Sequence, residues 1–292
     1  MEILVHRRVE FHQPEKRSEK VKCKPGPKGF HHEQGLYNDA ETNPEHPRKK
    51  TNPMKNSYFQ ILLGLLSVFF FAAESHGQMA VKGRLLLADD FKTPAEYIIE
   101  KWQPLRDGWR MRAWHGSWRR TSEGIESGWE TGHNPNLAYE GSFTNAVIEL
   151  EFRFHKEPGK TAYIQINATN LQLDPNAYSV SAWANVDAPQ RPVGLLLEHQ
   201  GWASQGFTIV ANQTAAIEPD KWYSMRLEMI DDYALISCNG VTIVGRHDKF
   251  GLPKTLLAIG VGYCPHELRN LRVYEATANP AWTKPAAASL AK

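Results

Sequence analysis

Apolar and polar residues alternate one by one in many short segments between residues 83 and 276. The clearest segment is Val147–Phe154. Its apolar positions fall on one face: Ile148, Leu150, Phe152 and Phe154. Its polar positions fall on the other: Glu149, Glu151 and Arg153. Because successive side chains of a strand point to opposite sides, the pattern predicts a half-buried β-strand.

Two following segments, Thr161–Ala168 and Tyr178–Ala184, alternate in the same way. In the first, the residues predicted to point inward are Ala162, Ile164 and Ile166, and those predicted to point outward are Tyr163, Gln165 and Asn167. In the second, Tyr178, Val180 and Ala182 share one side, and Ser179, Ser181 and Trp183 share the other. Further predicted strands are Gly83–Phe91, Gly116–Trp129, Val193–Glu198, Gly206–Ala211, Trp222–Ile230, Tyr233–Cys238, Val241–Arg246, Leu256–Gly262 and Leu268–Ala276.

Helix signals are scarce. Pro94–Lys101 is the one candidate, with Thr93 as N-cap and proline in the first turn. Asn239-Gly240 predicts a two-residue hairpin, since both residues tolerate the positive φ of a type I′ turn. About a dozen strands without intervening helices predict an all-β fold of two packed antiparallel sheets, with one short helix near the start.

An apolar run of about 13 residues, Ile61–Ala73, precedes the first strand. It is short for a membrane span and suits the core of a signal peptide, with Met54-Lys55 as start and positive region. Cleavage before Gln78 is expected, with Ala73-Glu74-Ser75 as the alternative site. The predicted organisation is a signal peptide over 54–77, a sandwich domain over 78–276 and a flexible tail over 277–292.

Residues 1–53 then have two interpretations. They are either an incorrectly assigned start, with translation beginning at Met54, or a disordered basic tail before an uncleaved signal anchor. The first predicts a secreted or periplasmic protein; the second predicts a protein anchored to the membrane by residues 58–73.

Charge and cysteine content exclude some classes of partner. Residues 1–53 hold 11 Lys and Arg and eight Asp and Glu; the whole chain is +2, so residues 54–292 carry −1. This balance favours no nucleic-acid partner, and contact with a membrane is expected only through the signal anchor. Cys238 and Cys264 leave a disulfide open, but no cysteine or histidine cluster has zinc spacing. No metal or cofactor is expected.

Four segments carry a resemblance to a known family. They are Leu85–Phe91, Trp118–Ile125, Phe143–Arg153, and Trp222 with Asn239-Gly240 followed by Leu268–Val273. On these, residues 84–276 resemble the concanavalin A-like lectin and glucanase jelly roll. Within that superfamily the chain is most similar to the secreted bacterial 3-keto-disaccharide hydrolase domains, which are related to glycoside hydrolase family 16. The resemblance implies a jelly-roll sandwich that binds, and in its enzymatic members cleaves, a sugar or keto-sugar. The chain departs from the pattern at Val261–His266, where a Leu-Gln-x-His-Gly stretch is usual, and it lacks the glucanase Glu-x-Asp-x-(x)-Glu signature.

Candidate catalytic residues begin with the carboxylates Glu149 and Glu151, which project from one strand face. A pair of carboxyl groups can cleave a glycosidic bond, one as acid and one as base or nucleophile. For a keto-sugar, a single base and an oxyanion stabiliser suffice, because the carbonyl makes the neighbouring C–H acidic. Glu151 or a rim histidine such as His133 would be the base, and Arg153 or Gln165 the stabiliser. The alternative is an ordinary solvated polar face.

Aromatic and polar residues around these strands suit a sugar, whose C–H faces pack on rings and whose hydroxyls bond to side-chain edges. The candidate substrate-binding residues are Arg153, Tyr163, Gln165, Asn167, Trp183, Trp202 and His199. The sequence thus predicts a carbohydrate partner. It leaves three functions open: a secreted glycosidase, a non-catalytic lectin-like or laminin-G-like binding module, and an adhesion domain without a small ligand.

Overall fold

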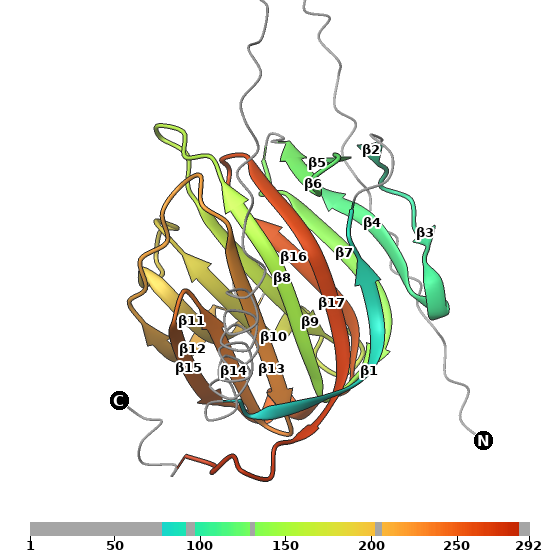
Figure 1. The fold of residues 1–292 in the computed structure, drawn as a ribbon, viewed down its shortest axis with the longest axis vertical. Helices are drawn as coiled ribbons and strands as arrows, with labels where there is room; N and C mark the ends of the chain where they lie inside the picture. The colour runs from blue at the N-terminus through green and yellow to red at the C-terminus, as the bar shows by residue number, and fades with distance from the viewer. Residues whose placement is uncertain (1–77, 92–96, 129–131, 202–205, 286–292) are drawn as a thin grey trace, which may run out of the picture. The chain divides into compact units, whose positions relative to one another are not determined.

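The computed structural model describes residues 78–91, 97–128, 132–201 and 206–285, and these form two antiparallel sheets. Figure 1 shows the sheets as two layers, with β8, β13 and β17 in one and β9, β10 and β16 in the other. The predicted all-β sandwich is confirmed. No helix among the described residues is long and apolar enough to cross a membrane.

The nine-stranded sheet has the order β15-β14-β13-β8-β17-β6-β5-β2, with β1 also paired to β17. Its strands are β1 (Ala80–Asp89), β2 (Tyr97–Ile98), β5 (Ser117–Arg120), β6 (Ile125–Gly128), β8 (Ala146–Phe154), β13 (Tyr223–Ile230), β14 (Tyr233–Cys238), β15 (Val241–Arg246) and β17 (His266–Ala278). The hairpin between β14 and β15 is confirmed: Asn239 and Gly240 have φ values of 49° and 74°.

The eight-stranded sheet has the order β12-β11-β10-β9-β16-β7-β4-β3. Its strands are β3 (Gln103–Pro104), β4 (Arg110–His115), β7 (Asn136–Phe143), β9 (Tyr163–Thr169), β10 (Ala177–Asn185), β11 (Gly194–Gly201), β12 (Phe207–Gln213) and β16 (Lys254–Val261). Two 3₁₀ turns complete the described structure, η2 (Arg106–Gly108) and η4 (Asp248–Gly251). The sequence had not predicted β3, β4 or β7.

The core lies between the sheets and contains the predicted inward faces. Ile148, Leu150, Phe152 and Phe154 of β8 belong to the same buried cluster as Ile164 and Ile166 of β9. Alternation therefore predicted the core side of these strands correctly. It did not predict that the other side of β9 is also buried, including Gln165 and Asn167. A buried polar row of this kind needs hydrogen-bond partners on the outer surface of the eight-stranded sheet.

The predicted helix over Pro94–Lys101 is wrong in its described part. Tyr97 and Ile98 form β2, which pairs with Arg119 and Trp118 of β5. Ile98 is buried in the main core, so pairing and burial outweigh the local helix signal. Residues 92–96 lie outside the described residues.

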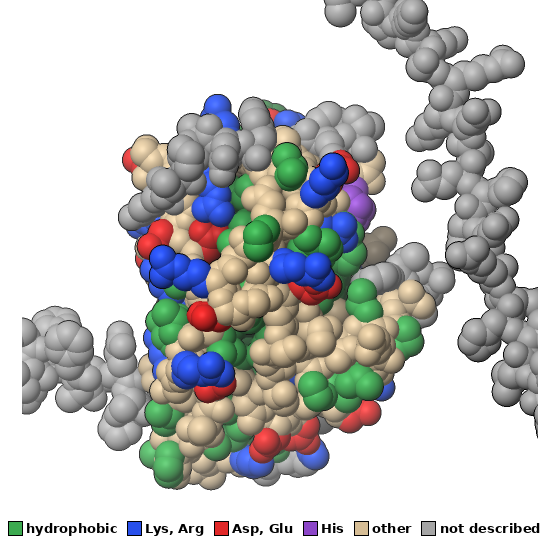
Figure 2. Space-filling model, turned by 90° about the vertical axis from the view of Figure 1, so that its right-hand side faces the viewer, with side chains coloured by type: hydrophobic (Ala, Val, Ile, Leu, Met, Phe, Trp, Pro, Cys, Tyr) green, Lys and Arg blue, Asp and Glu red, His purple; other side chains and the backbone are tan. Residues whose placement is uncertain are grey.

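Several charged side chains on the surface of the described residues form ion pairs. Figure 2 shows the side of the molecule where β1, β3 and β4 lie in Figure 1, with Lys and Arg next to Asp and Glu in several places. The ion pairs Arg84–Glu275 and Arg110–Glu140 involve β1 and β4. Cys238 and Cys264 are free, buried thiols.

Candidate functional site

The predicted site residues lie on two different sheets. Glu149, Glu151 and Arg153 belong to β8 of the nine-stranded sheet, whereas Tyr163, Gln165, Asn167 and Trp183 belong to β9 and β10 of the eight-stranded sheet. Both sets alternate with core residues and therefore face away from the core, on opposite sides of the sandwich. The candidate catalytic carboxylates and the candidate binding residues of β9 and β10 therefore do not share one face. There are two separate surfaces to consider.

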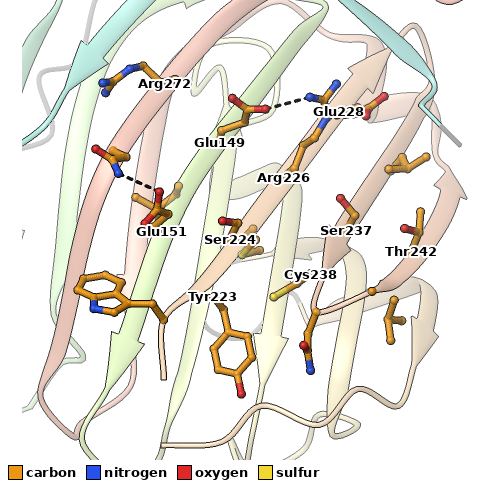
Figure 3. Close-up of a pocket in the computed structure, with 18 of the residues that line it drawn as sticks. Glu149, Glu151, Tyr223, Ser224, Arg226, Glu228, Ser237, Cys238, Thr242 and Arg272 are labelled. Carbon is orange, nitrogen blue, oxygen red and sulfur yellow. Dashed lines mark hydrogen bonds and ion pairs between the residues drawn. The ribbon is translucent and has the colours of Figure 1, made fainter. Parts of the chain in front are cut away.

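On the nine-stranded sheet, Glu149 and Glu151 line an open groove of about 1030 Å³. Glu149 Oε1 lies 2.6 Å from Lys82 Nζ and accepts from Arg226 Nη1 at 2.9 Å. Both oxygens of Glu151 are also occupied, by Arg269 Nε at 2.6 Å and Asn270 Nδ2 at 2.8 Å. Figure 3 shows the two carboxylates next to each other along β8, each joined by a dashed line to one of its partners. These contacts are those of structural ion pairs.

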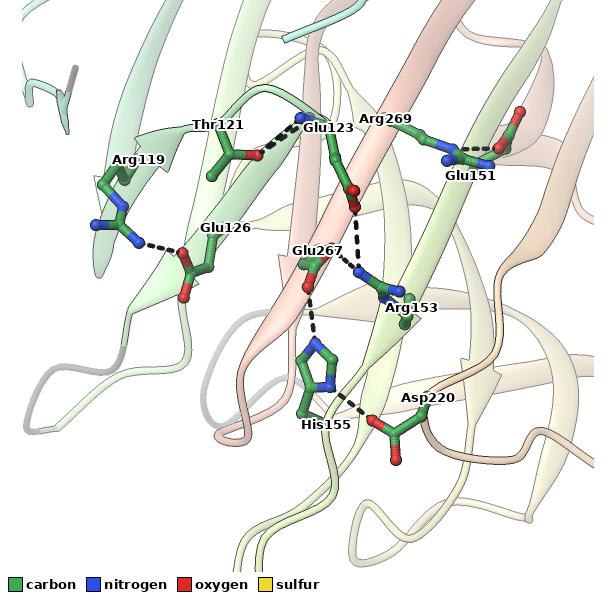
Figure 4. A network of polar contacts seen from close by, with 11 residues as sticks. Arg119, Thr121, Glu123, Glu126, Glu151, Arg153, His155, Asp220, Glu267 and Arg269 are labelled. Atoms are coloured by element: carbon green, nitrogen blue, oxygen red, sulfur yellow. Dashed lines mark hydrogen bonds and ion pairs between the residues drawn. The ribbon is translucent and has the colours of Figure 1, made fainter. Parts of the chain in front are cut away.

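Arg153 belongs to a network at one end of the same sheet (Figure 4). It pairs with Glu267 and lies 3.5 Å from Glu123. His155 joins the network through both ring nitrogens, with Nδ1 2.6 Å from Asp220 and Nε2 2.8 Å from Glu267. These carboxylates, Glu267 first, raise the pKa of His155. With both ring nitrogens held by carboxylates, His155 links the segment that carries Asp220 to β17, which carries Glu267.

The outer surface of the eight-stranded sheet carries a buried polar row. Ser181 Oγ donates to Asn167 Oδ1 at 2.5 Å and accepts from Trp183 Nε1 at 2.8 Å. The Trp183 ring packs on Tyr163 with centroids 4.9 Å apart, and the Arg191 guanidinium lies 5.1 Å above it. Trp183 is 5% exposed, so its ring supports the sheet surface and leaves little area for a ligand.

Arg191, which lies over Trp183, also pairs with a buried carboxylate, that of Glu198. Its Nε lies 2.9 Å from Glu198 Oε2, and the Glu198 side chain is fully buried. Burial raises the pKa of Glu198, and the Arg191 charge opposes that rise. Removing either partner would leave an uncompensated buried charge, so this pair holds the loop before β11 against the sheet.

A hollow of about 350 Å³ opens beside this row. Its lining residues are Trp114, His115, His133, Asn134, Asn136, Gln165, Tyr178, Gln200 and Gly201. The floor depends on Gly260 of β16, which pairs with Asn136 on one side and Gln165 on the other. A Cβ there would lie 2.4 Å from Gln165 Nε2 and 2.8 Å from Asn136 Oδ1. Because glycine has no side chain, the amide groups of Gln165 and Asn136 can occupy this space from either side.

Three polar atoms of the hollow are buried without a hydrogen-bond partner: Asn134 Nδ2, Asn136 Oδ1 and Gln165 Oε1. Asn136 and Gln165 are 3% and 5% exposed. Leaving such an atom unpaired costs about 1–3 kcal/mol, so a native structure is expected to supply a partner. One donor and two acceptors match hydroxyl groups, each of which both donates and accepts. In the larger groove most polar side chains already have partners, and we therefore take the smaller hollow as the candidate site.

Two histidines stand at the rim of the hollow. His115 and His133 stack with ring centroids 3.7 Å apart. His133 Nδ1 lies 2.8 Å from the Asn134 carbonyl oxygen. A carbonyl only accepts, so Nδ1 donates this hydrogen bond, and Nε2 is the ring nitrogen that does not take part in it. Burial raises the pKa of Tyr178, which also lines the hollow, to about 12, so its phenol stays protonated.

The remaining predicted residues do not line this hollow. His199 bonds to Asp174 at 3.1 Å and stacks on His247, 4.8 Å away, beside η4. His266 is fully buried with Nδ1 donating to the Cys264 carbonyl at 2.7 Å. Neither His199 nor His266 therefore lies in the hollow that His133 lines. Trp202 lies outside the described residues.

Sequence reasoning missed Asn136, His115 and Gly260. The first two lie on β7 and β4, two strands that were not predicted. Apolar Leu137 and Tyr139 alternate with Asn136 and Glu140, which is a signal for β7. Gly260 was placed in a predicted strand, where a glycine can mark a close approach by another group.

Residues 101–272 match the family described as the 3-keto-alpha-glucoside-1,2-lyase-like domain. The chain belongs to this family. Membership agrees with the resemblance expected from the sequence and supports a carbohydrate-active function. No curated protein matches the chain.

Several solved structures are similar to this lyase-like domain. The carbohydrate-binding module CBM66 from Bacillus subtilis is 13% identical, with 56% of this chain and 95% of that chain covered and a TM-score of 0.45. A Bacillus subtilis protein of unknown function with a galectin-like fold is 15% identical, with coverage of 69% and 100% and a TM-score of 0.47. SCLam, a non-specific endo-beta-1,3(4)-glucanase of family GH16, is 15% identical, with coverage of 68% and 96% and a TM-score of 0.45.

Proposed function

We propose that the hollow over Gly260 binds the keto-glucose unit of a 3-keto-α-glucoside and that the chain cleaves its glycosidic bond by elimination. The unpaired atoms of Asn134, Asn136 and Gln165 carry this proposal, since they present one donor and two acceptors to a ligand rich in hydroxyls. Membership of the lyase-like family supports the substrate class. Trp114 at the edge of the hollow offers an aromatic surface to the C–H face of a sugar.

The chemistry follows from the carbonyl at C3 of such a sugar. It acidifies the hydrogen on C2, so one base removes that proton and the electron pair moves into the enolate. The enolate then re-forms the carbonyl and expels the oxygen on C1, giving a C1–C2 double bond and a free alcohol after that oxygen takes a proton. Atoms and charge balance without an oxidant or a metal in the equation.

The residues of the hollow take distinct roles in this scheme. His133 removes the C2 proton through Nε2, because its Nδ1 already donates to a carbonyl. The amide N–H groups of Asn134 and Gln165 donate to the enolate oxygen, where negative charge develops in the transition state. Asn136 Oδ1 and Gln165 Oε1 accept from sugar hydroxyls and orient the ring.

A deuterium substitution at C2 tests the mechanism. The full chain is given a 3-keto-α-glucoside with hydrogen or deuterium at C2, and alcohol release and enone absorbance are followed. A primary isotope effect is expected, and the same glucoside without the keto group should be stable. Hydrolysis by two carboxylates breaks no C2–H bond, so equal rates for the two isotopic substrates would rule out the proposed step.

Variants on the two sheets separate the two candidate sites. His133→Asn and Gln165→Ala should each lower kcat, whereas Glu149→Gln and Glu151→Gln on the opposite sheet should leave turnover in place. The reverse pattern would move the chemistry to the groove of the nine-stranded sheet. Binding of the keto-glucoside with no turnover by the wild type would instead favour the lectin-like function.

Export belongs to the same proposal but has a separate test. The apolar run Ile61–Ala73 lies outside the described residues, and the signal peptide remains a prediction from the sequence. Sequencing the N-terminus of the native protein distinguishes the interpretations. A start at Gln78 supports secretion, and an intact run of residues 58–73 in a membrane fraction supports the anchor.

A further inference from the structure

A second hollow lies on the same sheet as the proposed keto-sugar site and shares a wall with it. This hollow of about 470 Å³ is lined by Trp102, Arg112, Trp114, Glu140, Gly141, Ser142, Leu171, Gln172, Thr255 and Leu256. Trp114 lines both hollows. The first hollow is centred on the pair Asn136–Gly260 of strands β7 and β16. The second lies beside the pair Glu140–Leu256, which is four residues further along the same two strands. Four residues along a strand correspond to about 13 Å between these two pairs, so a ligand that enters both hollows must be longer than one sugar ring.

Arg112 lines this second hollow and is held by two indole rings, while its Nε has no hydrogen-bond partner. Its guanidinium lies 4.6 Å from the ring centre of Trp102 and 5.6 Å from that of Trp114. Two indole contacts hold the guanidinium plane in place. Its Nε is buried without a hydrogen-bond partner. Within the described part of the chain Arg112 forms no ion pair, whereas Arg110, two residues earlier on the same strand, pairs with Glu140.

The charges around the second hollow leave a positive excess. Arg110 and Arg112 bring two positive charges, and Glu140 brings one negative charge that Arg110 already engages. A held guanidinium with an unsatisfied N–H is suited to a planar, negatively charged acceptor. Leu171, which is 38% exposed, and Trp102 add apolar surface for the C–H face of a ring.

We propose that this second hollow is a subsite for a carboxylate-bearing unit, so that the substrate is a keto-glucoside whose second unit is acidic. This rests on the proposed function of the first hollow. The carboxylate of a uronic acid and that of a non-sugar leaving group share the recognising chemistry. Trp114 divides the two subsites and contacts both units.

Two probes test the subsite without turnover. Both carry a 3-keto-α-glucosyl unit joined through carbon, which cannot leave, to a second ring. That ring is glucose in the neutral probe and glucuronic acid in the acidic probe. Titration calorimetry with the full chain is expected to give at least about tenfold tighter binding of the acidic probe, because charge-assisted hydrogen bonds exceed neutral ones. Salt should reduce this preference.

Variants of the two arginines provide the matched comparison. Arg112→Gln should abolish the preference for the acidic probe and leave neutral-probe affinity near that of the wild type. The double variant Arg110→Gln with Glu140→Gln removes the neighbouring ion pair without changing the net charge beside the hollow, and it should keep most of the preference. A third probe with benzoic acid as the second unit distinguishes the sources of the carboxylate: tighter binding than the uronate identifies a non-sugar leaving group.

The outcomes separate the two proposals. Binding of both probes with equal affinity, or an unchanged preference in Arg112→Gln, overturns the acidic subsite and leaves the keto-sugar site intact. Failure of the wild type to bind either probe removes the proposed function, and the subsite falls with it. Circular dichroism and urea unfolding of each variant exclude loss of folding as the cause.

Discussion

Replacing Gly260 by alanine tests the proposed site most directly, because this glycine supports the floor without supplying a polar group. Its Cβ would lie 2.4 Å from Gln165 Nε2, 2.9 Å from Gln165 Cγ and 2.8 Å from Asn136 Oδ1. These are side-chain atoms, so the two amides can swing aside. The backbone at Gly260 is not among the positive-φ glycines, and alanine is accepted there without backbone strain.

The expected magnitudes differ for stability and for binding. Overpacking of this kind costs about 1–3 kcal/mol, and the less flexible unfolded chain returns about 0.4–1 kcal/mol. The net loss of about 0–2.5 kcal/mol is smaller than the stability of a typical domain, about 5–15 kcal/mol, so the variant should fold. Displacing Asn136 and Gln165 removes two hydrogen bonds to the ligand, each worth about 0.5–1.5 kcal/mol. Affinity should therefore fall by roughly 5- to 150-fold.

The assay is calorimetric titration of the neutral carbon-linked probe, combined with urea unfolding of the same samples. Gly83→Ala is the control, since a Cβ there meets nothing closer than 3.3 Å and lies on the other sheet. The control should bind like the wild type. Wild-type affinity in a folded Gly260→Ala protein would refute the placement of the ligand over this glycine.

Three further predictions concern stability. Carboxylates raise the pKa of His155, so its contribution to the free energy of unfolding is fully present below the unfolded pKa of about 6.5 and is lost as pH rises through the folded pKa. Because the side chain is 41% exposed, we expect this contribution to be less than about 1 kcal/mol. Urea unfolding at pH 5.5 and pH 8.5 measures it, and His155→Gln should lack it. Burial lowers the pKa of His266 to about 4, so the unfolded state binds more protons than the folded state below about pH 6.5. Between pH 7 and pH 4 this difference should lower the free energy of unfolding by about 3 kcal/mol. An equal fall in His266→Asn would contradict the assignment to His266. Trp183→Ala should cost about 3–5 kcal/mol of unfolding free energy, since it removes a buried ring packed on Tyr163; a loss below about 1 kcal/mol would show that the ring is not part of the packing.

Local pattern was enough to predict most of the strands and their core sides. The alternation of Val147–Phe154 and Thr161–Ala168 placed Ile148 and Ile164 in the core, and Asn239-Gly240 placed a hairpin. These features depend on strand period and on turn geometry, which neighbouring residues determine. The Pro94–Lys101 helix was wrong because β2 gains its stability from pairing with β5, a partner about 20 residues away.

The candidate site could not be assembled in this way. Glu149 and Gln165 alternate with apolar neighbours in the same manner, and nothing in that alternation tells which strands share a sheet. Long-range pairing decided it: β8 joined β13 and β17, whereas β9 joined β10 and β16. The same pairing brought Asn136, Gly260 and Gln165 into one row from three distant segments. The sequence by itself determined which side chains leave the core, and only the tertiary structure decided which of them meet, because register between distant strands is set by the packing of the whole sandwich.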